Sequence, residues 1–185
     1  MEEALLTDPA DPLVHVASGL IDHLRGDHEA ERLAHARAVE LDPRALWGYL
    51  ALAGSQQENG ALADALATAR EAQRLDWYLP ATHSKVIDVL LDQERFDDAV
   101  DASELLVALE PDGFFGRRIL ARSLYRRGGV GDVGRAEPIL RELHDEWPAS
   151  PWIHAELREL YQATARGDLV AEEARHLLDL RPEIQ

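Results

Sequence analysis

An internal repeat of 34 residues constrains this chain more than any other feature, because a repeat sets the architecture before single elements are assigned. The segment from Gly26 to Pro43 aligns with the segment from Gly60 to Trp77, and a third copy runs from Glu94 to Pro111. A fourth copy, from Gly131 to Pro148, follows a three-residue insertion, and a fifth ends at Pro182. Five copies in one register predict a stack of similar structural units.

Each copy has the pattern of a helix with a marked start and a marked stop. A turn such as Gly26-Asp27 comes first, apolar residues follow at helical spacing, and proline ends the copy because it cannot continue a helix. Another helical stretch precedes each copy, over residues 12–25, 46–59, 80–93, 114–127 and 151–165. We expect Pro138, in the first turns of one helix, only where the amide has no helical partner. No segment alternates like a strand, so the sequence predicts an all-α fold.

A helix-turn-helix unit of 34 residues resembles the tetratricopeptide repeat (TPR). The residues that match the pattern of this family are Gly19, Gly26, Ala38, Pro43, Ala53, Gly60, Ala65, Ala72, Phe96, Ala99, Pro111, Trp152, Tyr161, Gly167, Asp168 and Pro182. Glu31, where the family usually has alanine, and Trp77, in place of the closing proline, depart from it. The resemblance implies a right-handed α-solenoid in which each repeat buries its apolar face against its neighbours.

The repeats also define the expected domain organisation. We expect one superhelical domain over residues 12–182, with repeats over residues 12–45, 46–79, 80–113, 114–150 and 151–182. Residues 1–11 form an acidic N-terminal extension. The first helix carries surplus apolar residues, among them Leu13, Leu20 and Leu24. Unless the segment Ala4–Leu6 covers them, this helix is a candidate surface for assembly into a homo-oligomer.

Charge and composition exclude several classes of protein. The chain has 35 acidic and 19 basic side chains and a formal charge of -16, so its long-range field repels nucleic acid and anionic membranes. It contains no cysteine, which excludes disulfides, thiolate metal sites and a cysteine nucleophile. The acidic start lacks the basic and apolar regions of a signal peptide. We therefore expect a cytoplasmic protein, complete at its N-terminus, and the alanine, leucine and arginine bias suggests a bacterial genome.

The local signatures of catalysis are missing from the sequence. It has no nucleophile elbow, no glycine-rich phosphate loop and no HExxH zinc motif. His28, Glu31 and His35 can share one helix face at a spacing that suits metal ligands, but no further ligand is close in sequence, and a solvated outer face explains them better. The sequence therefore predicts no catalytic residues, no metal and no cofactor.

Arginine is concentrated in the fourth repeat of this acidic chain. Five arginines and no acidic residue lie between Asp112 and Asp132, and Arg118, Arg122 and Arg126 are four residues apart along one helix. Guanidinium groups suit the capture of carboxylates. Two interpretations stay open for the stripe formed by Arg118, Arg122 and Arg126. The stripe binds an acidic ligand, or it forms a ladder of ion pairs between repeats. The acidic residues available for such a ladder are Asp88, Asp92, Glu156 and Glu159.

The family that the chain resembles usually binds ligands along the concave face made by the first helix of each repeat. Trp47, Phe115 and Trp152 share the second position of their repeats on this face, and Tyr125 accompanies the arginines. Aromatic side chains often anchor binding interfaces, although at helical spacing they equally suit a core.

Some TPR co-chaperones hold the C-terminal carboxylate of heat-shock chaperones with lysine and asparagine on successive first helices, followed by lysine and arginine. Lys85, Arg118 and Arg122 resemble the later basic residues, but Val16 and Leu20 stand where the first lysine and the asparagine would fall. We therefore expect no such clamp, and Lys85 remains a candidate partner contact.

These observations predict a non-enzymatic adaptor or scaffold that binds a partner protein or peptide in the concave groove. The partner would present an acidic or C-terminal segment to Arg118, Arg122 and Arg126, with an aromatic anchor near Phe115 or Trp152. The alternative is a small cytoplasmic chaperone that shields an apolar segment of a secreted or assembled client.

Overall fold

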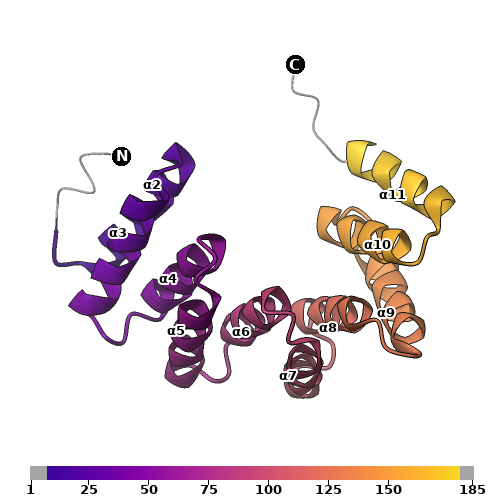
Figure 1. The fold of residues 1–185 in the computed structure, drawn as a ribbon, viewed down its shortest axis with the longest axis horizontal. Coiled ribbons are helices and arrows are strands. Elements are labelled where there is room, and N and C mark those ends of the chain that lie inside the picture. The colour runs from indigo at the N-terminus through magenta and orange to yellow at the C-terminus, as the bar shows by residue number, and fades with distance from the viewer. Residues whose placement is uncertain (1–7, 180–185) are drawn as a thin grey trace. The chain divides into compact units, whose positions relative to one another are not determined.

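The structure is a computed structural model that describes residues 8–179, with side chains as far as His176. The described residues form helices and no strand (Figure 1). The helices are α2 (Pro12–Arg25), α3 (His28–Leu41), α4 (Leu46–Glu58), α5 (Leu62–Leu75), α6 (Pro80–Asp92), α7 (Phe96–Leu109), α8 (Phe114–Arg127), α9 (Asp132–Glu146), α10 (Pro151–Ala163) and α11 (Gly167–Asp179). Successive pairs match the predicted repeats, which confirms the all-α helical-repeat fold. Only the ends of α4, α6 and α10 come one or two residues earlier than predicted, and the expectations for Ala4–Leu6 and Pro182 lie outside the described residues.

The chain divides into two compact units, Met1–Glu94 and Arg95–Gln185, and the division falls inside the third repeat. In the N-terminal unit, each helix from α2 to α6 packs on the next, and the first helices of successive repeats also contact each other. In the C-terminal unit, α8 packs on α7 and α9, and α10 contacts α8, α9 and α11. The single superhelical domain over residues 12–182 stays a prediction.

Short polar side chains and a glycine set both ends of α2 and the start of α3. The carboxylate of Asp11 accepts a hydrogen bond from the amide of Leu13 at 2.9 Å, and Pro12 occupies the first turn, where a missing amide costs nothing. Gly26 ends α2 at φ 76°, a left-handed conformation that glycine adopts without strain. Asp27 then caps α3 through the amide of Ala30. The local sequence therefore determines the turn between these two helices.

A proline followed three residues later by a histidine begins α2, α6 and α10. The histidines are His15, His83 and His154, and Nε2 of each lies 2.9, 2.6 and 2.9 Å, respectively, from the carbonyl oxygen of the residue six positions earlier. Because a carbonyl oxygen only accepts, each Nε2 carries the proton and donates it. This histidine clasp fixes the turn that leads into the first helices of repeats one, three and five.

Both units bury small and large apolar side chains. The fully buried residues of the N-terminal unit include the alanines Ala38, Ala53, Ala65, Ala69 and Ala72 and the larger Ile87 and Val89. Those of the C-terminal unit include the alanines Ala99, Ala121 and Ala136 and the larger Leu124, Leu140, Leu143, Ile153 and Leu160. Small residues let helix backbones approach closely, whereas larger side chains fill wider spacings. Among the apolar residues at helical spacing, Ala38, Ala99 and Leu106 are buried, whereas Leu33, Leu105 and Leu109 are 54%, 43% and 46% exposed.

The position expected for Pro138 is wrong. Pro138 lies inside α9 and well past its first turn, where the proline ring removes a hydrogen bond to the carbonyl four residues earlier. That earlier residue is Gly134. The helix continues to Glu146 because Leu140 and Leu143, beyond the proline, are fully buried in the core.

Candidate partner-binding surface

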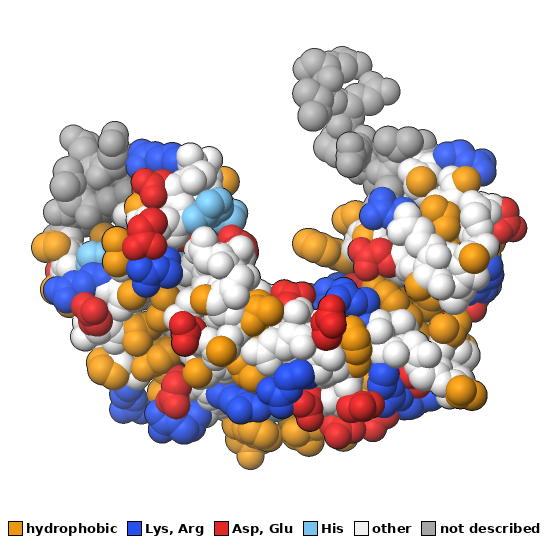
Figure 2. Space-filling model, viewed as in Figure 1, with side chains coloured by type: hydrophobic (Ala, Val, Ile, Leu, Met, Phe, Trp, Pro, Cys, Tyr) orange, Lys and Arg blue, Asp and Glu red, His pale blue; other side chains and the backbone are white. Residues whose placement is uncertain are grey.

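Most of the predicted binding residues lie on α8 and α10, which contact each other within the C-terminal unit. Trp47 on α4 and Lys85 on α6 belong to the N-terminal unit. On the face seen in Figure 2, acidic and basic side chains are interspersed within both units. The net negative charge is therefore not gathered into one patch on that face.

Arg118 joins α8 to α10 through a largely buried ion pair. Its Nη1 donates a hydrogen bond to Oε1 of Glu156 at 2.6 Å, and the two side chains are only 17% and 6% exposed. The guanidinium carbon also lies 6.0 Å from the ring centroid of Trp152, within range of a cation-π interaction. The inter-repeat ion pair that the sequence left open is therefore present at Arg118.

Tyr125 lies beneath this surface and links two carboxylates of α10. Its hydroxyl is 2.8 Å from Oε2 of Glu156 and 2.9 Å from Oε2 of Glu159, and the residue is only 6% exposed. A phenol has one proton, so it can donate to only one carboxylate at a time. Burial and the two nearby negative charges raise the pKa of Tyr125, which keeps the phenol protonated. Tyr125 therefore connects the helices chiefly as a hydrogen-bond donor.

Glu156 stands between opposing influences on its ionisation. Burial raises its pKa, and the neighbouring charge of Glu159 acts in the same direction. The positive charges of Arg122 and Arg118 and the hydrogen bond from Tyr125 oppose this shift without cancelling it. A proton on Glu156 would allow both contacts of the Tyr125 hydroxyl to be hydrogen bonds at once.

Arg126 faces a different neighbour from Arg118. Its guanidinium carbon lies 5.9 Å from the ring centroid of Phe96 on α7, and the residue is exposed. Eight residues of α-helix rotate the side chain about 80° past its starting direction, because each residue turns the helix by about 100°. The predicted stripe is consequently divided between the two sides of α8.

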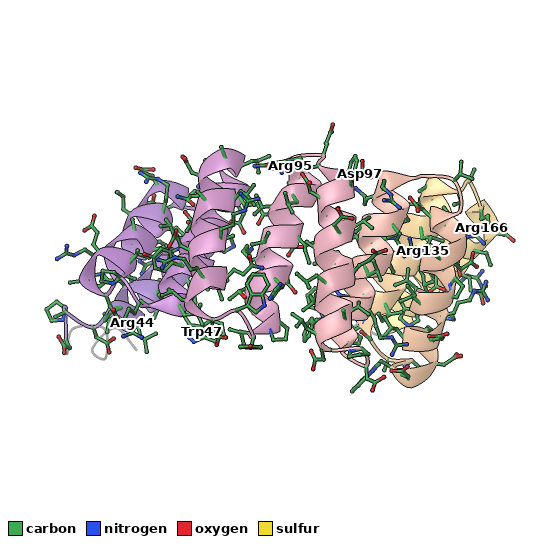
Figure 3. The ribbon with its side chains drawn as sticks, turned by 90° about the horizontal axis from the view of Figure 1, so that it is seen from below. Arg44, Trp47, Arg95, Asp97, Arg135 and Arg166 are labelled. Carbon is green, nitrogen blue, oxygen red and sulfur yellow. The ribbon has the colours of Figure 1, made fainter. Side chains whose placement is uncertain are left out.

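The remaining arginines of this segment form ion pairs with helices of the same unit. Arg117 donates to Glu146 of α9 at 2.7 Å. Arg127 donates to Asp132 at 2.7 and 2.8 Å and to Asp97 of α7 at 3.3 Å; Asp97 and Arg135, a further basic residue of α9, are labelled in Figure 3. The hydrogen bonds from Arg127 lower the pKa of Asp132. The arginine-rich segment therefore contributes to inter-helix pairing.

The predicted aromatic anchors are largely exposed. Phe115 is 60% and Trp152 is 64% exposed, and the Phe115 ring stands edge-on to Phe114 with centroids 5.4 Å apart. In the N-terminal unit, Trp47 is 56% exposed at the start of α4 (Figure 3). Nζ of Lys85 donates to Oε1 of Gln57 at 3.2 Å.

Comparisons with known proteins identify the fold. No protein-family model matches the sequence, and no curated protein matches it. Among solved structures, yeast Tom70 superposes with a TM-score of 0.74 at 21% identity over 99% of this chain, which spans 39% of the Tom70 chain. TTC0263, a thermophilic TPR protein of Thermus thermophilus, superposes with a TM-score of 0.77 at 18% identity, over 94% of this chain and 93% of the TTC0263 chain. YrrB, described as a TPR protein with an unusual peptide-binding site, superposes with a TM-score of 0.60 at 15% identity, over 99% of this chain and 93% of the YrrB chain. The chain has the tetratricopeptide-repeat fold.

Tertiary contacts bring together polar residues that the sequence analysis did not associate. Glu173 sits on the last helix, yet its carboxylate is buried and lies 2.6 Å from Nδ1 of His154. A cavity of about 270 Å³ beside it is lined by residues that include Tyr161 and His176. A second group of histidines and glutamates lies in the N-terminal unit. Both clusters combine residues of different helices, so local spacing signalled only the pair His28 and Glu31. No helix among residues 8–179 is long and apolar enough to cross a membrane.

Proposed function

We propose that this TPR protein is a non-enzymatic scaffold that binds a segment of a partner protein on the first helices of its repeats. Phe115 and Trp152 would hold apolar side chains of the partner, and Arg118, Arg122 and Arg126 would receive an acidic or C-terminal segment. In the N-terminal unit, Trp47 and Lys85 are separate candidate partner contacts. TPR proteins are generally protein-interaction scaffolds, and YrrB is described as having a peptide-binding site.

The observation that carries this proposal is the arrangement of Trp152, Arg118 and Glu156. The exposed indole lies near a guanidinium group whose position is held by a buried carboxylate. A guanidinium has five N–H donors, and the bond to Glu156 occupies one of them. Groups that are already held in position lose less entropy when a partner binds. An aromatic surface beside a positioned cation suits a segment with both apolar and acidic side chains.

The test compares partner capture by three forms of the full chain. The double variant Phe115→Ala/Trp152→Ala removes the proposed anchors, and Tyr78→Ala removes a side chain that is 85% exposed in the turn before α6. Proteins captured from extract of the native cells by the wild type would be identified by mass spectrometry, and binding of a purified partner measured by calorimetry. We expect the double variant to bind the partner at least ten-fold more weakly, which corresponds to a loss of about 1.4 kcal/mol or more of binding free energy. We expect Tyr78→Ala to bind as tightly as the wild type. Equal affinity of all three forms would overturn the site assignment.

A chaperone for a secreted or assembled client is the second candidate function. The exposed aromatic rings of Phe115, Trp147 and Trp152 favour it, because they would shield an apolar client segment. Salt screens charge contacts and leaves apolar contacts intact. Affinity that falls steeply between 50 and 500 mM salt would support the acidic-segment scaffold, and affinity that is insensitive to salt would support the chaperone. A bacterial cytoplasmic location belongs to both proposals.

A further inference from the structure

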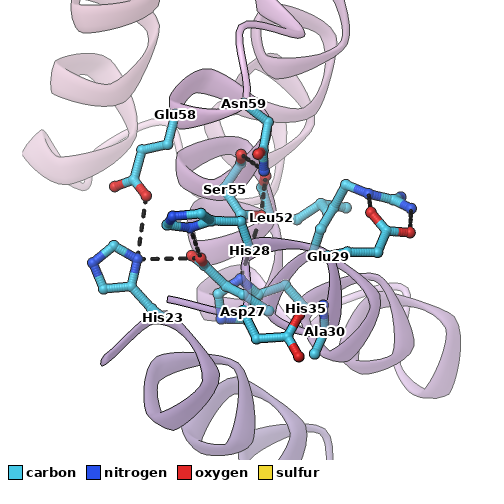
Figure 4. Close-up of polar contacts among 12 residues, drawn as sticks. His23, Asp27, His28, Glu29, Ala30, His35, Leu52, Ser55, Glu58 and Asn59 are labelled. Carbon is cyan, nitrogen blue, oxygen red and sulfur yellow. Dashed lines mark hydrogen bonds and ion pairs between the residues drawn. The ribbon is translucent and has the colours of Figure 1, made fainter. Parts of the chain in front are cut away.

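Four side chains from three helices of the N-terminal unit converge on one point (Figure 4). His23 lies near the end of α2, His28 and Glu31 lie in the first turns of α3, and Glu58 is the last residue of α4. One nitrogen or oxygen of each side chain lies within 4.8 Å of the corresponding atoms of the other three. We call these four residues the His-Glu cluster.

The distances inside the His-Glu cluster match those between ligands of a tetrahedral metal ion. Nδ1 of His23 lies 3.1 Å from Oε2 of Glu31 and 3.2 Å from Oε2 of Glu58, and Nδ1 of His28 lies 3.3 Å from the same oxygen of Glu31. Ligand atoms about 2.0 to 2.1 Å from a tetrahedral zinc ion are about 3.3 Å apart. Small rotations of His23, Glu58 and His28, whose side chains are 41%, 51% and 52% exposed, would bring the remaining pairs to that spacing.

Glu31 has an electrostatic reason to receive a cation. Its side chain is only 5% exposed, and its ion-pair partners are the imidazoles of His23 and His28, which carry charge only when protonated. A buried carboxylate needs a compensating positive charge. Glu58 brings a second carboxylate to the same point. A divalent cation would neutralise both carboxylates while the imidazoles stay neutral.

The sequence predicted no metal because it placed only His28, Glu31 and His35 on one face. The structure separates His35 from this group: its ring is buried against Gly19, and Nδ1 faces the hydroxyl of Ser55 at 3.4 Å. His23 and Glu58 take its place from the neighbouring helices. The site thus exists only where α2, α3 and α4 meet.

We propose that His23, His28, Glu31 and Glu58 bind one Zn²⁺ ion that clamps the first repeat to the second. Two imidazole nitrogens with two carboxylate oxygens suit zinc, whereas Ca²⁺ and Mg²⁺ prefer oxygen ligands alone. Four protein ligands complete a tetrahedral shell, so the ion stabilises the fold and leaves no open position for catalysis. The proposal is independent of the partner-binding residues on α8 and α10, which lie in the other unit.

The C-terminal unit contains a comparable group, His154, Glu173 and His176, that does not meet the same criteria. Both ring nitrogens of His154 are already engaged, Nε2 by the Pro148 carbonyl and Nδ1 by Glu173. This group has three members against four in the N-terminal unit. It serves as the competing site that the experiment must distinguish.

The experiment titrates Zn²⁺ into tag-free, chelator-treated full chain and follows binding by calorimetry and thermal unfolding. Co²⁺ provides a spectroscopic probe, because tetrahedral coordination gives intense visible absorption. We expect one equivalent of Zn²⁺, a raised melting temperature and no comparable effect of Mg²⁺. The double variant His23→Gln/Glu58→Gln changes two partly exposed side chains and should still fold. It should bind Zn²⁺ at least ~100-fold more weakly, beyond the ~10- to 100-fold caused by loss of an outer-shell partner.

Two controls make the outcome decisive. Glu40→Gln alters an exposed carboxylate of α3 outside the cluster and should bind Zn²⁺ like the wild type. His176→Gln alters the competing group and should also leave Zn²⁺ affinity unchanged. The proposal is overturned if the wild type shows no Zn²⁺ binding, if the double variant binds as well as the wild type, or if His176→Gln abolishes binding.

Discussion

Gly19 of α2 faces the imidazole of His35 on α3 so closely that a Cβ atom at position 19 would lie 2.3 Å from Nε2. His35 is only 2% exposed, and its other ring nitrogen faces Ser55 of α4. The ring therefore fills the space that the missing side chain leaves between the first two helices. This contact gives a structural reason for glycine at a position that also matches the TPR pattern.

We expect Gly19→Ala to destabilise the protein by about 1–3 kcal/mol, because the buried ring has no room to move and the packing must be strained. The matched control is Gly54→Ala in α4, where a Cβ would make only an ordinary contact with Nζ of Lys85 at 3.7 Å. That change should stabilise the helix by about 0.5–1 kcal/mol. Urea unfolding of both variants checks the two opposite signs. A Gly19→Ala variant as stable as Gly54→Ala would contradict the close contact.

Glu156 should make stability depend on pH in a direction opposite to most carboxylates. Its pKa in the folded protein is raised above the ordinary 4.5. Its contribution to the free energy of unfolding is therefore present below pH 4.5 and is lost as the pH rises through its pKa in the folded protein. We therefore expect Glu156→Gln to gain stability relative to the wild type as pH rises from 4.5 to 7. Urea unfolding at several pH values measures this difference.

Asp132 provides the control with the opposite sign. Hydrogen bonds from Arg127 lower its pKa below the ordinary 3.8, so its contribution is present above pH 3.8 and is lost as pH falls through the folded value. The cost of Asp132→Asn should therefore be larger at pH 7 than at pH 3. Parallel pH profiles for the two variants would refute the environments assigned to both carboxylates.

The histidine clasps should differ in their contribution to stability according to their second contact. His154→Gln removes the buried 2.6 Å contact between Nδ1 and Glu173 as well as the bond to the Pro148 carbonyl, and loss of a buried hydrogen bond that leaves its partner unsatisfied costs about 1–3 kcal/mol for each partner. His15→Gln removes only an exposed hydrogen bond to the Pro9 carbonyl and should cost about 1 kcal/mol. Thermal and urea unfolding of the two variants tests the order. Equal losses would mean that the contact with Glu173 adds nothing.

The outer face of α2 should support self-association. Leu13, Leu20 and Leu24 are 58%, 56% and 85% exposed, and such apolar side chains on one helix favour contact with a second copy. We expect sedimentation equilibrium to show a concentration-dependent dimer that Leu20→Glu/Leu24→Glu disrupts. The matched variant Leu105→Glu/Leu109→Glu, at exposed positions of α7, should leave the dimer intact. A wild type that is monomeric at every concentration would rule out this interface.

Helix positions could be predicted from the sequence because their signals are local. The 34-residue period, the turn at Gly26-Asp27 and the first-turn prolines act over a few neighbouring residues, and they place the helices to within one or two residues. Pro138 is the exception, since it lies inside α9 and not where its amide would have no helical partner, and the buried Leu140 and Leu143 keep the helix continuous beyond it. In that helix, tertiary packing outweighs the preference of a single residue.

The candidate sites show a different division between sequence and structure. The sequence alone determined the all-α repeat fold, the enrichment of arginine on α8 and the placement of Trp152 and Phe115 at equivalent positions of their repeats. Only the tertiary structure decided that Arg118 meets Glu156 while Arg126 turns toward Phe96, and that His23 and Glu58 join His28 and Glu31. Helical periodicity specifies a direction around one helix, whereas these contacts depend on how far neighbouring helices are rotated and displaced along their axes. Side chains at the junction of three helices are brought together by packing, which no spacing along the chain records.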